Sequence, residues 1–361
     1  YTTIITVAAL PAVLYFATVA FFVIAEAGRS GVRAIEDDNA PKFMEVLKRR
    51  SHSCFGEYFL EALVHESAMA EVYRAHRLEA PEDPPRILKR LLERRRGDAG
   101  FEALFAHEQE LASILHSPEL PLCVHSGDVE GWPFMILEAA PGIPLVRLLA
   151  AALAQKRTFR FETAVHILEQ VARGLAVAHA AVDREGEALS LVHMDVAPQN
   201  VLVDEAGRAT LIDFGIARSR RLGEKATLLR GRSAYLAPEQ LERGHVDQRA
   251  DIFAFGTLFH EALFCRPLFR SHGEDQTRWR VAHAPIPRLE GAGASTAATQ
   301  AILDRCLARD PDERYRHAAE LSADLSCLRA ELQVSEEELR LDLEELHRLA
   351  PTPTSSQHDH K

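Results

Sequence analysis

Two carboxylates and one carboxamide lie close together in the C-terminal half of the sequence, at Asp195, Asn200 and Asp213. Oxygen atoms of such groups are the ligands that Mg²⁺ prefers, and a carboxylate can also orient a hydroxyl group and accept its proton. The segment 201–212 predicts a short hairpin that returns Asp213 beside Asn200. This set of groups suits magnesium-assisted transfer of a phosphoryl group. The alternative is that the three residues only cap a turn.

These residues belong to three motifs that follow one another along the chain. They are His193-Met194-Asp195-Val196-Ala197-Pro198-Gln199-Asn200, Asp213-Phe214-Gly215 and Ala237-Pro238-Glu239. The set resembles the catalytic loop, the magnesium loop and the end of the activation segment in eukaryotic-like bacterial serine/threonine protein kinases, and is similar to myxobacterial examples. The resemblance implies ATP and Mg²⁺ as cofactors, a protein substrate, Asp195 as the base, and Asn200 and Asp213 as magnesium ligands. Small-molecule phosphotransferases are an alternative, although they usually lack the last two motifs.

The same resemblance assigns residues upstream of these motifs. Lys89, at the end of an apolar strand pattern, would meet the α and β phosphates of ATP and pair with Glu108, for which Glu110 is a nearby competitor. Backbone groups of Glu138 and Ala140 would contact the edge of the adenine. The plain alternatives are an ordinary exposed lysine and an apolar strand without a ligand.

Two further residues are expected to support the catalytic loop from within the protein. The resemblance implies that Asp251 braces the loop and that Arg314 pairs with Glu239 at the end of the activation segment. We expect a structural role for both residues and no direct part in the chemistry.

The loop that would cover the phosphates departs from the family pattern. A glycine-rich loop is expected at 65–73, but all three glycines are missing, and the small residues that would face the phosphates are Ser67, Ala68 and Ala70. A β-carbon restricts positive φ and the close approach of backbone amides to phosphate. Other positions differ from the usual lysine, threonine and arginine of the family: Ala197, Arg232 and Met194. The alternative function is therefore a pseudokinase that serves as a nucleotide-binding or scaffolding module.

The elements that must position these residues change in type along the chain. Alternating apolar residues predict short strands near 58–60, 71–75 and 86–89. Helical periods dominate after Pro141-Gly142. A strand-rich part followed by a helix-rich part predicts an α+β fold with two lobes and a cleft between them.

This pattern sets the expected domain boundaries. The kinase domain is expected over 56–332, with an N-lobe at 56–138 made of an antiparallel sheet plus one helix. A mostly helical C-lobe is expected at 143–332. The remaining segment, 333–361, is expected to form an acidic surface helix and a disordered tail.

The N-terminal segment from Thr2 to Ala25 is uncharged and long enough to span a bilayer. We expect a transmembrane helix over 1–26 and a juxtamembrane segment over 27–55. Arg29 and Arg33 follow the span, and no basic residue precedes it, so the positive-inside rule places the kinase domain in the cytoplasm. The expectation is a membrane protein that is single-pass over this stretch. A signal peptide and a buried core helix are the alternatives.

Composition limits the possible partners. The formal net charge of −11 argues against a nucleic acid partner, because such proteins carry a basic patch or stripe. The five cysteines are scattered and include no C-x-x-C pair, so they predict neither a disulfide framework nor a zinc site. The sequence sets no expectation for the oligomeric state.

Overall fold

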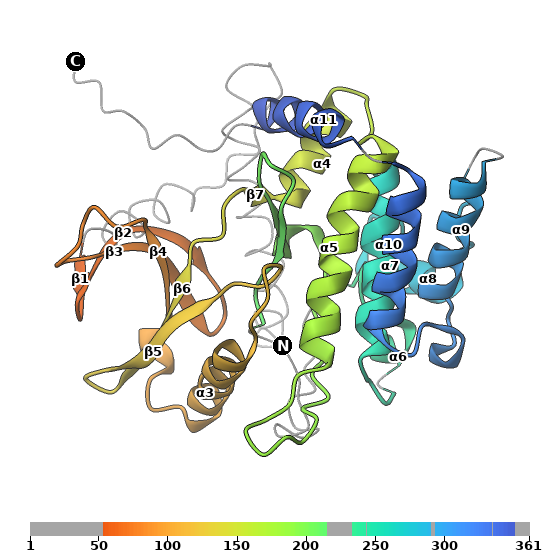
Figure 1. Cartoon of the computed structure of the whole chain (residues 1–361). Coiled ribbons are helices and arrows are strands. Elements are labelled where there is room, and N and C mark those ends of the chain that lie inside the picture. The colour runs from red at the N-terminus through yellow and green to blue at the C-terminus, as the bar shows by residue number, and fades with distance from the viewer. Residues whose placement is uncertain (1–52, 215–232, 243, 290–292, 334, 351–361) are drawn as a thin grey trace, which may run out of the picture.

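The computed structural model describes residues 53–214, 233–242, 244–289, 293–333 and 335–350 of the chain (Figure 1). The expected transmembrane span, Gly215, Arg232 and the expected disordered tail lie outside these residues. Across the described ranges, no helix combines the length and the apolar character needed to cross a bilayer.

The N-terminal lobe contains a six-stranded antiparallel sheet with the strand order β1-β2-β3-β4-β6-β5. Its strands are β1 (Ser53–Phe55), β2 (Tyr58–Glu66), β3 (Ala70–Arg77), β4 (Arg86–Leu91), β5 (Cys123–Val129) and β6 (Trp132–Glu138). The three strands expected from apolar alternation are β2, β3 and β4. β1 lies N-terminal of the expected domain boundary at residue 56, inside the segment expected to be juxtamembrane.

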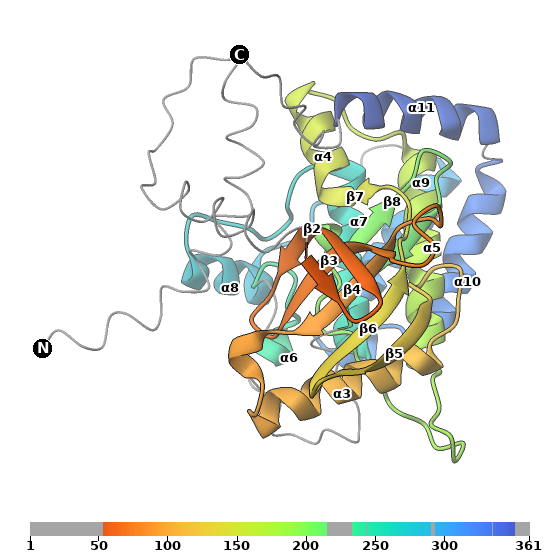
Figure 2. The ribbon, with the colours of Figure 1, turned by 90° about the vertical axis from the view of Figure 1, so that its left-hand side faces the viewer.

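Among the described residues, one α-helix, α3 (Ala99–Ile114), lies against this sheet (Figure 2). Asp98 caps its N-terminus, since its carboxylate accepts hydrogen bonds from the amides of Gly100 (3.0 Å) and Phe101 (3.4 Å). Phe105 of α3 packs in a buried cluster with Leu91 of β4 and other apolar residues. This packing fixes α3 next to the strand that carries Lys89.

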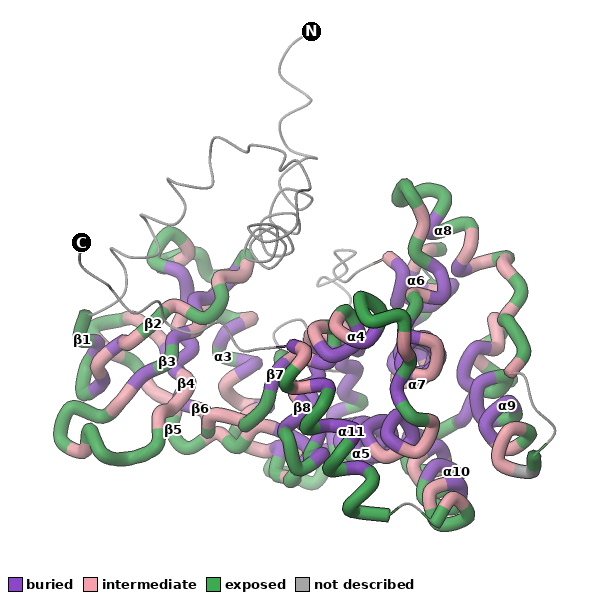
Figure 3. Tube along the Cα trace, turned by 90° about the horizontal axis from the view of Figure 1, so that it is seen from above, coloured by how far each residue is buried: buried purple, intermediate pink, exposed green. Residues whose placement is uncertain are grey.

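The C-terminal lobe is mostly helical. Its elements are β7 (Ile143–Pro144), α4 (Leu145–Ala154), α5 (Phe161–His179), β8 (Val201–Val203), β9 (Ala209–Leu211), α6 (Pro238–Leu241), α7 (Arg249–Phe264), α8 (Glu274–His283), α9 (Ala294–Cys306), α10 (Ala318–Glu331) and α11 (Glu336–Leu349). Buried positions are concentrated along α5 and α7, which form the centre of the lobe (Figure 3). The two-lobed α+β architecture expected from the sequence is thus confirmed.

The segment after β6 connects the two lobes. Gly142 has a φ of +102°, and a Cβ atom there would lie 2.2 Å from the carbonyl oxygen of Val203, so only glycine fits this position. β7 then pairs with β8, with Ile143 opposite Val203. The hinge therefore leads directly onto the hairpin that follows Asn200.

The acidic helix expected near the C-terminus is α11, and it packs on α4 and α5. Its buried face includes Leu343 and Leu346. Asp342, although charged, is also buried and accepts hydrogen bonds of 2.6 Å from both Thr163 Oγ1 and a guanidinium nitrogen of Arg157. These partners satisfy a carboxylate that would otherwise be costly to bury.

Candidate active site

The side chain of Lys89 joins the two lobes of the site. Its Nζ donates one hydrogen bond to Glu108 Oε1 of α3 and another, of 3.1 Å, to Asp213 Oδ1. Burial disfavours the charged ammonium, but the carboxylates of Asp213 and Glu108 outweigh this effect and raise the pKa of Lys89. Lys89 is therefore a cation at neutral pH. The competitor Glu110 faces His107 at 3.9 Å, so Glu108 is the partner.

Asp195 and Asn200 contact each other in the catalytic loop. The Nδ2 of Asn200 donates to Asp195 Oδ2 and to the Asp195 carbonyl oxygen, both at 2.8 Å. Because the amide nitrogen is used in this way, the Oδ1 of Asn200 is the atom left to act as a ligand. The amide of Ile212 donates to the carbonyl oxygen of Asn200 at 2.8 Å, which returns Asp213 to the site as the hairpin pattern predicted.

The chemistry of these donors suits a magnesium ion. Mg²⁺ is usually held by one or two protein oxygens together with phosphate oxygens and water, and does not need a closed cage of side chains. The Asp213 carboxylate is 40% exposed, and Asn200 is buried and bonded through its carbonyl oxygen to the residue before Asp213. Asn200 and Asp213 would therefore hold the ion on the phosphates of a nucleotide.

The catalytic loop is fixed by Asp251 of α7. Its carboxylate accepts hydrogen bonds from the amides of His193 (2.7 Å) and Met194 (2.9 Å) and contacts His179 Nε2 at 2.9 Å. Asp251 is only 1% exposed, so these contacts are shielded from water. Met194 adopts a φ of +72°, which is unusual for a residue with a side chain and is stabilised by this bracing.

Arg314 forms the second contact expected from the sequence. Its guanidinium donates to both carboxylate oxygens of Glu239, at 2.7 and 2.8 Å. It also donates to the carbonyl oxygens of Arg249, Ala308 and Arg309. A fully used guanidinium of this kind anchors the start of α6 to the helical lobe.

Met194 makes a contact that the sequence did not predict. Its sulfur lies 3.8 Å from Nε2 of Gln240, whose Oε1 accepts a hydrogen bond of 2.8 Å from the amide of Ala237. The position that usually carries an arginine thus links the catalytic loop to α6 without any phosphate group.

The glycine-free loop between β2 and β3 is closed by Ser67. The Oγ of Ser67 accepts hydrogen bonds from the amides of Met69 (3.2 Å) and Ala70 (2.9 Å), and the amide of Ser67 donates to the Ala70 carbonyl at 2.8 Å. No described residue of this loop has positive φ. The two amides are therefore occupied inside the loop. Serine side chains often bond to backbone amides two or three residues ahead, and Ser67 was the sequence signal for this closed turn.

The hinge residues sit at the end of β6. The amide of Glu138 donates to the Leu122 carbonyl at 2.9 Å, and its side chain contacts Arg86 at 3.1 Å. Ala140 is half-buried.

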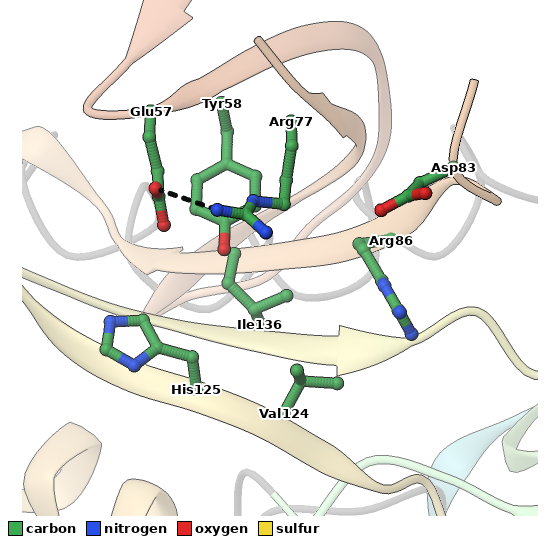
Figure 4. A pocket seen from close by; sticks show the side chains of 8 residues that line it. All are labelled: Glu57, Tyr58, Arg77, Asp83, Arg86, Val124, His125 and Ile136. Atoms are coloured by element: carbon green, nitrogen blue, oxygen red, sulfur yellow. Dashed lines mark ion pairs between the residues drawn. The ribbon is translucent and has the colours of Figure 1, made fainter. Parts of the chain in front are cut away.

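A separate cavity on the N-terminal lobe contains none of the predicted site residues (Figure 4). Its lining residues are Glu57, Tyr58, Arg77, Asp83, Arg86, Val124, His125 and Ile136.

Residues 68–324 match the family model of the protein kinase domain, and the chain therefore belongs to the protein kinase family. Among curated proteins, it is 30% identical over 265 residues to the tyrosine-protein kinase MasK of Myxococcus xanthus, which covers 72% of this chain and 41% of MasK. It is 29% identical over 282 residues to the serine/threonine-protein kinase PknL of Mycobacterium tuberculosis, covering 77% of this chain and 67% of PknL.

A third relative is the serine/threonine-protein kinase PknE of Mycobacterium tuberculosis, which is 30% identical over 320 residues, covering 86% of this chain and 52% of PknE. The chain thus spans between about two fifths and two thirds of the length of these relatives. These similarities confirm the resemblance to eukaryotic-like bacterial protein kinases.

Proposed function

We propose that the chain is a protein serine/threonine kinase that transfers the γ-phosphate of ATP to hydroxyl groups of proteins in signalling. The observation that carries the proposal is the contact of Lys89 with both Glu108 and Asp213. Phosphoryl transfer by protein kinases requires an ion pair between this lysine and a helix carboxylate, and a carboxylate of the magnesium loop in place beside them.

Each residue of the site has a separate part in the proposed mechanism. Lys89, fixed by Glu108, would bind the α and β phosphates, while Asn200 and Asp213 would hold Mg²⁺, which neutralises phosphate charge when bound. Asp195 would orient the substrate hydroxyl and accept its proton. Its hydrogen bond from Asn200 keeps that carboxylate in one orientation.

Serine and threonine are proposed as the acceptors, because PknL and PknE are named serine/threonine kinases. MasK is named a tyrosine kinase, so the acceptor is part of the test. The purified protein would be incubated with labelled Mg-ATP, alone and with a generic basic protein, with Asp195→Asn as the control. We expect label on phosphoserine or phosphothreonine after acid hydrolysis. Label only on phosphotyrosine would refute the acceptor, and no label beyond the control would refute the activity.

A pseudokinase is the second candidate, and the closed turn at Ser67 favours it. Amides that bond to Ser67 Oγ do not meet phosphate oxygens, which weakens nucleotide binding at this loop. The same labelling experiment decides between the two candidates, because a pseudokinase would bind partners or nucleotide without transferring label.

We also propose that the segment from Thr2 to Ala25 anchors the protein as a single-pass helix, with the kinase domain in the cytoplasm. The support is its uncharged apolar length and the basic residues that follow it. The chain should sediment with membranes and resist alkaline carbonate, whereas a variant beginning at Ser51 should stay in the supernatant. Release of the full chain by carbonate would contradict the anchor.

A further inference from the structure

We propose that strand β1 controls the position of the ATP-binding lysine through Arg90, the residue next to Lys89 in β4. This inference rests on the proposed function, because it concerns the same nucleotide site. The side chains of Phe55, Tyr73 and Trp132 surround the Arg90 guanidinium, and we call these three rings the aromatic clamp.

The Arg90 guanidinium contacts three aromatic rings and one carboxylate. Its guanidinium carbon lies 4.2 Å from the ring centroid of Trp132, 4.9 Å from that of Phe55 and 5.0 Å from that of Tyr73. Its Nε donates to Glu71 Oε2 at 3.0 Å, and the Glu71 side chain is only 2% exposed. Cation–π contacts and a shielded ion pair together hold this side chain in one place.

The aromatic clamp forms where the two edges of the sheet approach each other. β1 lies at one edge of the strand order and the β6-β5 pair at the other. The ring of Phe55 nevertheless packs edge-on against Trp132 (5.4 Å between centroids) and Phe134 (5.5 Å). A Cβ atom on Gly56 would lie 3.0 Å from Val129 in β5. The sheet is therefore curled, and β1 closes it around Arg90.

This closure acts on the nucleotide site through β4. Adjacent residues of a strand point to opposite faces, so Arg90 points into the aromatic clamp while Lys89 points to Glu108 and Asp213. The cross-strand partners are Glu71 for Arg90 and Val72 for Lys89. Trp132 also donates its indole N–H to the Leu91 carbonyl of the same strand. The aromatic clamp and Glu71 thus hold β4 against β3.

β1 lies outside the residues that match the protein kinase family, which begin at residue 68. The chain enters the described domain through this strand. A change in the pairing of β1 would withdraw Phe55 from Arg90 and loosen β4, and Lys89 would lose its fixed distance to Glu108. Arg90 and Phe55 are therefore positioning residues, and β1 is the point at which the preceding segment can regulate the site.

The test is a double-mutant cycle on Mg-ATP affinity, measured by calorimetry with the full chain in detergent. Phe55→Ala should weaken binding about tenfold when Lys89 is present and less than about twofold in the Lys89→Met background, because the effect passes through Lys89. Arg90→Met should behave like Phe55→Ala, and Arg90→Lys should restore part of the affinity by keeping the cation. Equal weakening in both backgrounds would overturn the inference, since it would indicate only a general loss of structure.

The matched control is Arg74→Met, which removes an exposed arginine of the neighbouring strand that pairs with Glu61 at 2.8 Å. It should leave ATP affinity unchanged.

Hydrogen exchange without nucleotide gives a second, independent readout. Phe55→Ala should speed exchange of the β4 amides but not those of α10. Unchanged exchange in β4 would overturn the inference. Absence of ATP binding by the parent would instead refute the proposed function, and the exchange result would still decide on the clamp.

Discussion

The catalytic loop and the phosphate loop fix their backbone amides in opposite ways. The amides of His193 and Met194 bond to Asp251, which lies on a buried helix far away in the sequence. The amides of Met69 and Ala70 bond to Ser67, within the same loop. A distant brace shapes a loop for its substrate, whereas a local bond withdraws the amides from a ligand. The comparison predicts that the groups for the chemical step are in place and that nucleotide binding is weakened.

The largest expected effect tests the catalytic side of this comparison. Asp195→Asn and Asp213→Asn should each lower the rate of phosphoryl transfer by about a thousandfold, or about 4 kcal/mol, because one loses the base and the other a magnesium ligand. The measurement is single-turnover transfer from labelled ATP with the purified variants.

The control for this experiment is Asp275→Asn, an exposed carboxylate in the first turn of α8. It should leave the rate unchanged. Circular dichroism should show that all three variants are folded. Normal turnover by Asp195→Asn would contradict its role as the base, and normal turnover by Asp213→Asn would contradict its role as a magnesium ligand.

The second prediction concerns α7, the helix that carries Asp251. His260 of α7 is buried, and within the described residues neither ring nitrogen has a hydrogen-bond partner. Burial lowers the pKa of His260 to about 4, from 6.5. The folded state thus prefers neutral histidine, and the unfolded state binds more protons between these values.

Stability should therefore be lost as the pH falls from about 6.5 to about 4, by about 3 kcal/mol over the whole window. His260→Leu should remove this acid-dependent loss, whereas His283→Leu, at an exposed site on α8, should keep it. The measurement is the free energy of urea unfolding at pH 7 and pH 4.5. An identical loss in the parent and in His260→Leu would show that His260 is not the group that titrates.

Much of the site could be predicted because it is encoded in short motifs. The sequence indicated Lys89, Glu108, Asp195, Asn200 and Asp213, and the structure brings Lys89 to two carboxylates and Asn200 to Asp195. Their roles stay predictions, since these contacts do not measure catalysis. The hairpin after Asn200 followed from a local pattern in the same way.

The contacts that could not be predicted depend on segments that are distant in the sequence. A strand as short as β1 has almost no periodicity, so nothing local indicated that Phe55 would reach Trp132 across the curled sheet. The amphipathic pattern of α11 predicted a helix but not that Asp342 would be buried against Thr163. Such contacts arise from tertiary packing, which residue spacing alone does not specify.

The smallest expected effect tests the phosphate loop. Ser67→Gly should free the amides of Met69 and Ala70 for the phosphates and improve Mg-ATP affinity by about tenfold, or about 1.4 kcal/mol. The gain is limited because glycine also makes the free loop more flexible. Ser67→Ala is the matched variant, since it removes the hydroxyl but keeps the β-carbon. Ser67→Ala should give part of the gain in Mg-ATP affinity, because the amides of Met69 and Ala70 lose their bond to Oγ.

Replacing His65, Ser67 and Ala70 together would restore the three missing glycines, but the structure narrows the useful change to Ser67. Ala70 is fully buried and has no positive φ, so glycine there would remove packing without opening the loop. Loop amides bind phosphates in the ground state and the transition state alike, so KM should fall with little change in kcat. Lys89→Met should cancel the gain. Micromolar binding by the parent that Ser67→Gly does not improve would mean that the closed turn already binds phosphate. The catalytic loop and the phosphate loop would then differ in how their amides are bonded but not in their ability to bind a ligand.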